Sequence, residues 1–132
     1  MYIFKLDADD QVMGLHCCNH MAFHFPKDDN EFITRRYTPI SLSNDKGHVA
    51  FVIKTYKRSE EFPEGGKVSQ ILYDLEPGKK IRMEGPMGLL NYMGFGNFVI
   101  RKKPVKKTKI GIIAGGTGLT PCFPIIKAST LA

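Results

Sequence analysis

The sequence contains few cysteines, and their spacing favours neither a disulfide framework nor a zinc site. Cys17 and Cys18 are adjacent and Cys122 stands alone. Adjacent cysteines are rarely bridged, because disulfide geometry is demanding. We therefore expect free thiols in a reducing compartment. No metal site is expected, because the four histidines have no acidic partner at ligand spacing.

Long apolar runs are also missing. No run approaches the roughly 20 apolar residues that cross a bilayer. The opening MYIFKLDADD has neither the charged start nor the apolar centre of a signal peptide. The sequence therefore predicts a soluble protein on the cytoplasmic side of membranes.

Acidic residues are fewer than basic ones, 13 against 19, and the positive excess is concentrated in one place. Residues 100–109, IRKKPVKKTK, hold six Lys or Arg around one proline. We interpret this run first as a solvated linker between domains. A docking face for an acidic protein is the second interpretation. Nucleic-acid binding is the third, because no aromatic side chains alternate with these charges to stack on bases.

The chain does contain a series of short β-like stretches separated by turns. They are rich in β-branched and aromatic residues, as strands are. The expected strands are residues 2–6, 20–25, 32–38, 49–56, 80–84 and 98–101. Hairpin-length connections favour a mainly β fold, an antiparallel barrel rather than a parallel sheet.

Two helices are expected among these strands. The first follows Gly65 and Gly66, where Val68 and Leu72 recur at helical spacing. Later, the continuous apolar run 110–114 predicts a strand buried on both faces. The second helix should follow it, with Thr120 as cap and Pro121 at its first position. Pro124 would then clash with a preceding carbonyl.

Three motifs suit a phosphate-bearing ligand. In RRYTPIS, Arg35 and Tyr37 share one strand face, a guanidinium for phosphate and a ring for stacking. The alternative is a plain exposed strand. GGKVS, residues 65–69, offers side-chain-free backbone, a lysine and a hydroxyl, although an ordinary loop at a helix cap fits too. GGTGLTP, residues 115–121, resembles the dinucleotide fingerprint, but Pro121 replaces its third glycine.

Five motifs occur in a recognisable order: RRYTPIS, VIKTY, FPEGGKVSQIL, GPMGLL and IAGGTGLTP. Together they resemble the NADH–cytochrome b5 reductase family, within the ferredoxin–NADP reductase-like flavoproteins. The resemblance implies a six-stranded antiparallel FAD-binding barrel with one short helix at 1–100. It also implies a basic linker at 101–109 and the beginning of a nicotinamide-binding α/β domain at 110–132.

The resemblance further implies residue roles. Arg35 would hold the FAD pyrophosphate, Tyr37 would pack on the flavin, and Thr38 would lie near its reactive nitrogen. The implied FAD-binding residues are Arg35, Arg36, Tyr37, Thr38, Val52, Ile53, Lys54, Tyr56, Gly65, Gly66, Lys67, Val68, Ser69 and Thr120. The implied NADH-binding residues are Lys54, Gly115, Gly116, Thr117, Gly118, Thr120 and Pro121. Thr38 and Lys54 would form the hydride-transfer environment, and no acid–base residue is assigned.

The implied function is that of an oxidoreductase, passing electrons from NADH through FAD to an acidic haem protein such as cytochrome b5. Family members are often attached to the endoplasmic reticulum or the mitochondrial outer membrane. Against the family pattern the chain is expected to be truncated at both ends, since Met1 falls within the first barrel strand and no Cys-Gly-Pro motif occurs. An FAD-binding module without turnover is therefore the alternative. Arg36 also departs from the family, where Pro or a small residue is usual.

Overall fold

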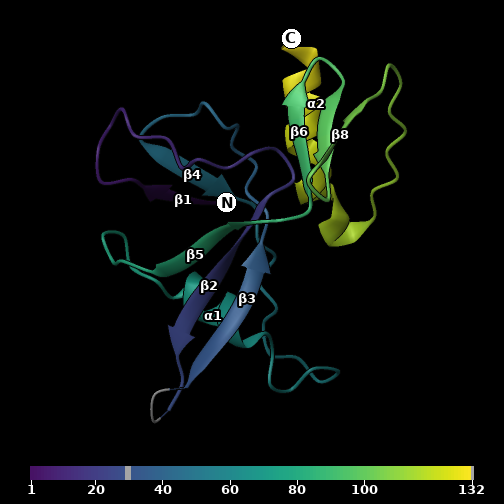
Figure 1. The fold of residues 1–132 in the computed structure, drawn as a ribbon. Helices are drawn as coiled ribbons and strands as arrows, with labels where there is room; N and C mark the ends of the chain where they lie inside the picture. Colours follow the sequence, from purple (N-terminus) through teal and green to yellow (C-terminus); the bar gives the residue numbers. More distant parts are fainter. Residues whose placement is uncertain (29–30, 132) are drawn as a thin grey trace.

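The computed structural model describes residues 1–28 and 31–131, and the fold is mainly β with two α-helices (Figure 1). In chain order the elements are β1 Tyr2–Lys5, β2 His20–Pro26, β3 Phe32–Tyr37, β4 His48–Phe51, α1 Lys67–Tyr73, β5 Arg82–Met87, β6 Leu90–Gly94, β7 Asn97–Ile100, β8 Lys103–Lys106, the 3₁₀ turn η1 Gly116–Gly118, and α2 Leu119–Thr130.

The strands form three antiparallel sheets. The first pairs β1 with β4, the second has the order β3-β2-β5, and the third has the order β6-β7-β8. The prediction of antiparallel β-structure is confirmed. Within the described residues, however, ladder hydrogen bonds do not join these sheets into one closed barrel.

The main core lies between the first two sheets and α1. Phe23 and Phe51 are fully buried, and their ring centroids lie 4.9 Å apart in an edge-to-face arrangement. Val68 and Leu72, one helical turn apart on α1, close the same core. Burying each such side chain stabilises a fold by about 1.5–3 kcal/mol, so α1 depends on this packing. The first predicted helix is thereby confirmed.

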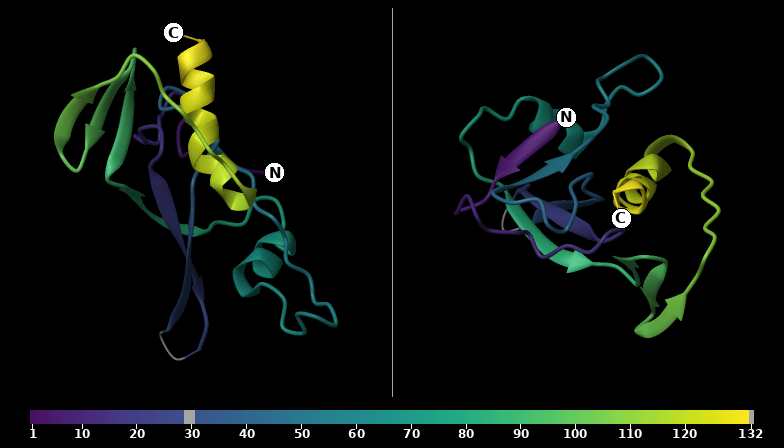
Figure 2. Two further views of the ribbon diagram at one scale, coloured as in Figure 1. Left: turned by 90° about the vertical axis from the view of Figure 1, so that its right-hand side faces the viewer. Right: turned by 90° about the horizontal axis from the view of Figure 1, so that it is seen from above.

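A second, smaller core joins the β6-β7-β8 sheet to α2. Cys17, Tyr92, Phe98 and Ile125 are buried together there. Figures 1 and 2 show α2 lying alongside this sheet. No helix within residues 1–28 and 31–131 is both long and apolar enough to cross a membrane.

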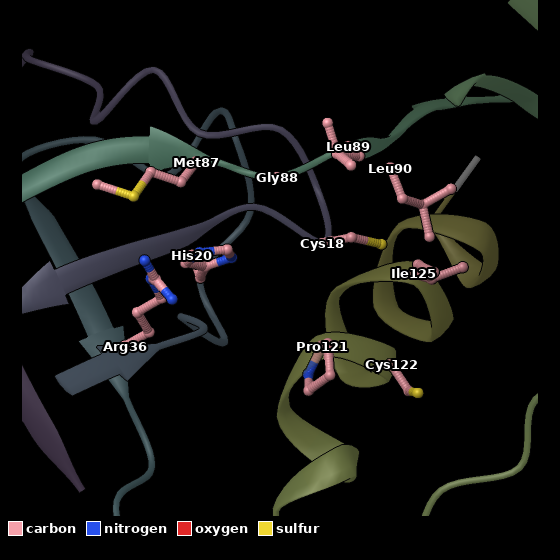
Figure 3. Close-up of a pocket in the computed structure, with 10 residues that line it drawn as sticks. All are labelled: Cys18, His20, Arg36, Met87, Gly88, Leu89, Leu90, Pro121, Cys122 and Ile125. Atoms are coloured by element: carbon pink, nitrogen blue, oxygen red, sulfur yellow. The ribbon is translucent and has the colours of Figure 1, made fainter. Parts of the chain in front are cut away.

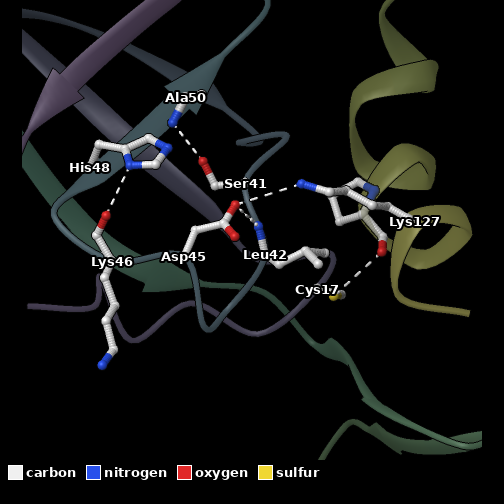
Figure 4. Close-up of polar contacts among 9 residues, drawn as sticks. Cys17, Ser41, Leu42, Asp45, Lys46, His48, Ala50 and Lys127 are labelled. Carbon is white, nitrogen blue, oxygen red and sulfur yellow. Dashed lines mark hydrogen bonds and ion pairs between the residues drawn. The ribbon is translucent and has the colours of Figure 1, made fainter. Parts of the chain in front are cut away.

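Polar contacts fasten α2 to the rest of the molecule (Figure 4). The ammonium of Lys127 lies 3.7 Å from a carboxylate oxygen of Asp45, and the same oxygen accepts a hydrogen bond from the backbone N–H of Leu42 at 2.9 Å. The thiol of Cys17 donates to the carbonyl of Pro124 at 3.7 Å. The ion pair joins α2 to the turn that precedes β4, and the Cys17 bond joins it to the segment that precedes β2.

The start of α2 differs from the prediction. The helix begins at Leu119 with Gly118 as N-cap, and Thr120 does not cap it. Instead the hydroxyl of Thr120 donates to the carbonyl of Thr117 at 3.0 Å, because the chain already turns in η1. Pro124 lies within the continuous helix and is fully buried, so packing of its ring offsets the hydrogen bond its missing N–H cannot make.

Other predictions for chain segments also need correction. The strand expected at 49–56 ends at Phe51, and residues 110–114 form no strand: Ile113 is fully exposed. Figure 2 shows that segment as a loop standing away from the sheets. A doubly buried strand needs neighbours on each side, and none of the described strands pairs with it.

The basic run expected to be a linker contains strand β8, which pairs with β7 in register Phe98↔Val105. Its charges therefore stand on an edge strand, where lysines discourage pairing with other chains. Strand β6 was not expected either. The domain boundaries at 100 and 110 stay predictions.

Candidate functional site

Strand β3 separates two arginines that are neighbours in the sequence. Arg35 and Tyr37 line one cavity, of about 510 Å³, whereas Arg36 lines a different one. Alternation along a strand explains this, because successive side chains point to opposite faces. The ladder with β2, which pairs Phe23 with Arg35 and Ala22 with Arg36, holds the strand in this register.

The ring of Tyr37 packs against a core residue. Its ring meets Phe23 edge-on, with centroids 5.0 Å apart. Burial raises the pKa of the Tyr37 phenol, and the nearby Arg35 charge opposes that rise only in part. The ring is therefore neutral near pH 7 and held in a fixed orientation beside the cavity.

Arg35 is exposed, and most of its guanidinium N–H groups are available as hydrogen-bond donors. One of its terminal nitrogens donates to the carbonyl of Thr34 at 2.8 Å. A guanidinium carries five N–H donors, so most of them remain for a ligand. The bond to Thr34 fixes the side chain near the cavity rim.

The glycine pair of the GGKVS loop is required by the loop's own packing. Gly65 has a φ of +63°, a conformation that favours glycine. A Cβ on Gly66 would collide with the hydroxyl of Ser69 and would lie 2.9 Å from Cβ of Tyr56. The backbone N–H of Gly66 also donates to the carbonyl of Tyr56 at 2.8 Å. The glycines thus allow the loop to lie directly against Tyr56.

Ser69 completes this attachment. It is buried, and its hydroxyl accepts a hydrogen bond from the backbone N–H of Tyr56 at 3.1 Å. The same hydroxyl donates to the carbonyl of Gly66 at 3.1 Å. Since a hydroxyl has a single proton to donate, this arrangement leaves none for a phosphate.

The segment that follows β4 supplies a further part of the lining. The ammonium of Lys54 lies 5.0 Å from the ring centroid of Tyr56, a cation–π distance. Lys54 and Tyr56 are both exposed and Ile53 is half-buried. This part of the lining therefore combines a positive charge with an aromatic face.

This cavity, which we call the FAD-candidate cavity, brings together most of the residues expected to bind FAD. Its lining residues are Arg35, Tyr37, Ile53, Lys54, Tyr56, Phe62, Glu64, Gly65, Gly66, Lys67, Val68, Ser69 and Thr117. Three of them are cationic, one is acidic and three are aromatic. Such a surface suits a ligand that joins negative charge to flat rings.

Some of the expected residues lie elsewhere. Thr38, Val52 and Thr120 do not line this cavity in the described structure, and Arg36 faces the second one. Of the Gly-rich loop 115–121, only Thr117 reaches the FAD-candidate cavity, while Pro121 lines the second. The roles inferred for these residues stay predictions.

Two lining residues were not expected. Phe62 and Glu64 lie in the loop just before the glycine pair and reach the cavity because that loop folds back on Tyr56. Nothing in their local pattern indicates this. Among the described residues, no group of three or more His, Cys, Asp or Glu could hold a metal ion.

Comparison with known proteins gives one consistent result. A family model described as the oxidoreductase FAD-binding domain matches residues 1–92. NADH-cytochrome b5 reductase 2 of Homo sapiens is 39% identical over 96% of this chain, and NADH-cytochrome b5 reductase 3 of Mus musculus is 41% identical over 95%. The crystal structure of the cytochrome b5 reductase domain of Ulva prolifera nitrate reductase superposes with a TM-score of 0.86 at 40% identity, covering 96% of this chain.

The chain is shorter than these relatives. It spans 49% of the human protein, 44% of the mouse protein and 48% of the Ulva prolifera domain structure. The similarity therefore concerns about half of each of them.

Proposed function

The chain belongs to the oxidoreductase FAD-binding domain family, and from this we propose that it binds FAD in the cavity lined by Arg35, Tyr37 and the GGKVS loop. The family match covers residues 1–92 and contains every lining residue except Thr117. The observation that carries the assignment is the convergence of Arg35, Tyr37 and Lys67 on one cavity from two separate elements. FAD would supply the redox chemistry, accepting two electrons and releasing them singly.

The residues present fit the two charged phosphates of such a ligand. Arg35 offers free guanidinium donors, and Lys67 adds a second positive charge at the loop. Among the lining residues that the structure describes, Glu64 alone is acidic, so positive charge prevails. In this proposal Ser69 holds the loop against Tyr56 and does not bind the phosphate itself.

The rings of the ligand fit the remaining surface. Tyr37 presents a ring held by Phe23, and Tyr56 lines the same cavity with its ring beside Lys54. Aromatic stacking of this kind contributes about 0.5–1.5 kcal/mol beyond area burial. Thr38 and Lys54 are proposed to border the position where hydride arrives, Lys54 from the cavity wall itself.

The wider reaction rests on the relatives. We propose that a longer protein containing this domain passes electrons from NADH through FAD to an acidic haem protein such as cytochrome b5. Exposed lysines on β8 and its flanks, at 102, 103, 106 and 107, would speed the encounter with such a partner. Residues 115–121 would contribute to the NADH site.

A specific observation supports the alternative, FAD binding without turnover by this chain alone. Ile113 is fully exposed, and of residues 115–121 only Thr117 lines the candidate cavity. A nicotinamide site needs more surface than these residues provide. The two functions differ in whether NADH reduces the bound flavin.

The flavin spectrum tests both. Protein incubated with excess FAD and then desalted is expected to keep about one flavin per chain, seen as an absorbance band in the visible region. Colourless protein that retains no flavin would overturn FAD binding. Addition of NADH without oxygen then separates the alternatives, because bleaching of the band requires hydride transfer and an unchanged band identifies a binding module.

A further inference from the structure

A second cavity, of about 650 Å³, lies between the β3-β2-β5 sheet, the turn that follows β5, and α2 (Figure 3). This volume falls within the range of roughly 300–1,000 Å³ usual for small-molecule sites. Its lining residues are Cys18, His20, Arg36, Met87, Gly88, Leu89, Leu90, Pro121, Cys122 and Ile125. It stands on the face of β3 opposite the FAD-candidate cavity.

One side of this cavity is polar and positively charged. Figure 3 shows Arg36 and His20 next to each other on this side. Burial, and then the charge of Arg36, lowers the pKa of His20, so near pH 7 His20 is neutral and Arg36 carries the charge. None of the ion pairs formed between described residues involves Arg36. Its guanidinium is therefore available to an external anion.

The other side is apolar. Leu89 and Leu90 face α2 across the cavity, and Pro121 and Ile125 form the helix wall (Figure 3). Leu89 is 66% exposed, so this apolar wall is accessible from solvent. Ile125 is buried with Cys17, Tyr92 and Phe98, so packing holds α2 next to the β6-β7-β8 sheet.

The combination selects a class of ligand. A single guanidinium pairs well with one carboxylate, through two parallel N–H···O bonds. A nucleotide, with several negative charges, would find only one cation here. Facing apolar walls stabilise a bound hydrocarbon chain because they remove its surface from water.

We propose that this cavity binds an aliphatic monocarboxylate of the fatty-acid type. The carboxylate pairs with Arg36, and the tail lies between the 87–90 turn and α2. This site is distinct from the FAD-candidate cavity, since β3 stands between the two and their lining residues do not overlap. Occupation by the carboxylate therefore leaves FAD binding possible.

Calorimetric titration of the FAD-saturated protein with octanoate tests the proposal. We expect octanoate to bind, and octanol, with the same tail and no charge, to bind at least about tenfold more weakly. Butyrate, with the charge and a short tail, should also bind more weakly. Equal affinity for octanol, no octanoate binding in titrations at two well-separated temperatures, or loss of octanoate binding on FAD saturation would each overturn it.

Variants then locate the ligand. Arg36→Gln should reduce octanoate affinity about tenfold or more. The matched control is Arg82→Gln, which removes an exposed arginine of the same sheet that lies outside the cavity. If both variants lose binding equally, or if neither does, Arg36 is not the carboxylate partner.

A second measurement, the alkylation rate of Cys122, uses the wild-type protein. It therefore does not depend on whether Arg36→Gln folds. Cys122 lines the cavity and is half-buried, so bound octanoate should slow its alkylation by iodoacetamide. Mass spectrometry of peptides gives the rate for each cysteine. An unchanged Cys122 rate at saturating octanoate would contradict the proposed position of the tail.

Discussion

The hydroxyl of Ser69 lies 3.1 Å from the backbone nitrogen of Tyr56 and accepts its hydrogen bond. The bond spans 13 residues and joins α1 to the segment after β4. Together with the bond from the Gly66 N–H to the Tyr56 carbonyl, it brings two walls of the FAD-candidate cavity together. Ser69 is thus a positioning residue for this cavity.

Replacing Ser69 by alanine should destabilise the fold. Ser69→Ala leaves the Tyr56 N–H without its acceptor, at an expected cost of about 1–3 kcal/mol in the free energy of unfolding. Urea denaturation measures this. Ser43→Ala, at an exposed serine, is the control and should leave the midpoint unchanged. Equal midpoints for the two variants would contradict the role given to Ser69.

Gly66→Ala should displace the loop and weaken FAD binding. The added Cβ would meet both the Ser69 hydroxyl and the Tyr56 side chain, so the loop must move away from its wall. Flavin titration should show a loss of affinity, about tenfold for each 1.4 kcal/mol. Gly111→Ala is the matched control, because a Cβ there meets nothing within 4 Å. Retention of full affinity by Gly66→Ala would show that the loop does not hold the ligand.

Arg35 should matter more to FAD than its neighbour. A charged hydrogen bond contributes about 1.5–3 kcal/mol, so Arg35→Gln is expected to weaken FAD binding about 10- to 100-fold. Arg35→Lys keeps the charge without the planar fork and should fall between. Arg36→Gln, on the opposite face, should lose less. A larger loss for Arg36→Gln than for Arg35→Gln would show that the two faces are assigned the wrong way round.

Asp45 should contribute more to stability than its partner Lys127. The ion pair at 3.7 Å is partly exposed, and such pairs contribute about 0–1 kcal/mol. Asp45 also accepts the N–H of Leu42, so Asp45→Ala should cost about 1 kcal/mol more than Lys127→Ala. Thermal unfolding of both single variants and the double variant separates the two contributions. Equal destabilisation by the two single changes would count against this division.

Cys18 should react slowly with alkylating agents although it is only half-buried. Burial first, then the neighbouring thiols Cys17 and Cys122, raise its pKa from 9.0 to about 12. The folded state therefore prefers the protonated thiol. Its contribution to stability is complete below pH 9.0 and is lost as the pH rises toward about 12. Alkylation at pH 8 should be much slower in the folded protein than in urea, and equal rates would contradict the raised pKa.

The composition and spacing of residues within a single segment were enough to predict some elements of the fold. Aromatic content between turns predicted β2, whose Phe23 and Phe25 lie in the core, and helical spacing predicted α1. Strands β6 and β8 were not predicted from the sequence, because their glycine, lysines and proline have low β-propensity. Both strands form by pairing with β7. Each of these strands depends on its neighbour along the chain, so its own residues alone do not predict it.

The candidate site shows the same division. Contiguous motifs singled out Arg35, Tyr37 and the GGKVS loop, and these residues line one cavity. Phe62 and Glu64 could not be predicted, because a loop folding back on Tyr56 brings them there. The sequence also did not show why the glycines are needed, since the contacts that require Gly65 and Gly66 involve Tyr56, nine and ten positions away.

The alternation of β3 makes the two cavities sensitive to insertions and deletions in the β2–β3 hairpin. If β3 slipped by one position along β2, Arg35 and Arg36 would exchange places. Each guanidinium would then lie in the cavity that the other lines now. The ligand preference of both cavities therefore depends on the length of the β2–β3 connection as well as on the residues that touch the ligands. Among relatives, a change in that turn length would be expected to accompany a change in which neighbouring position carries the arginine.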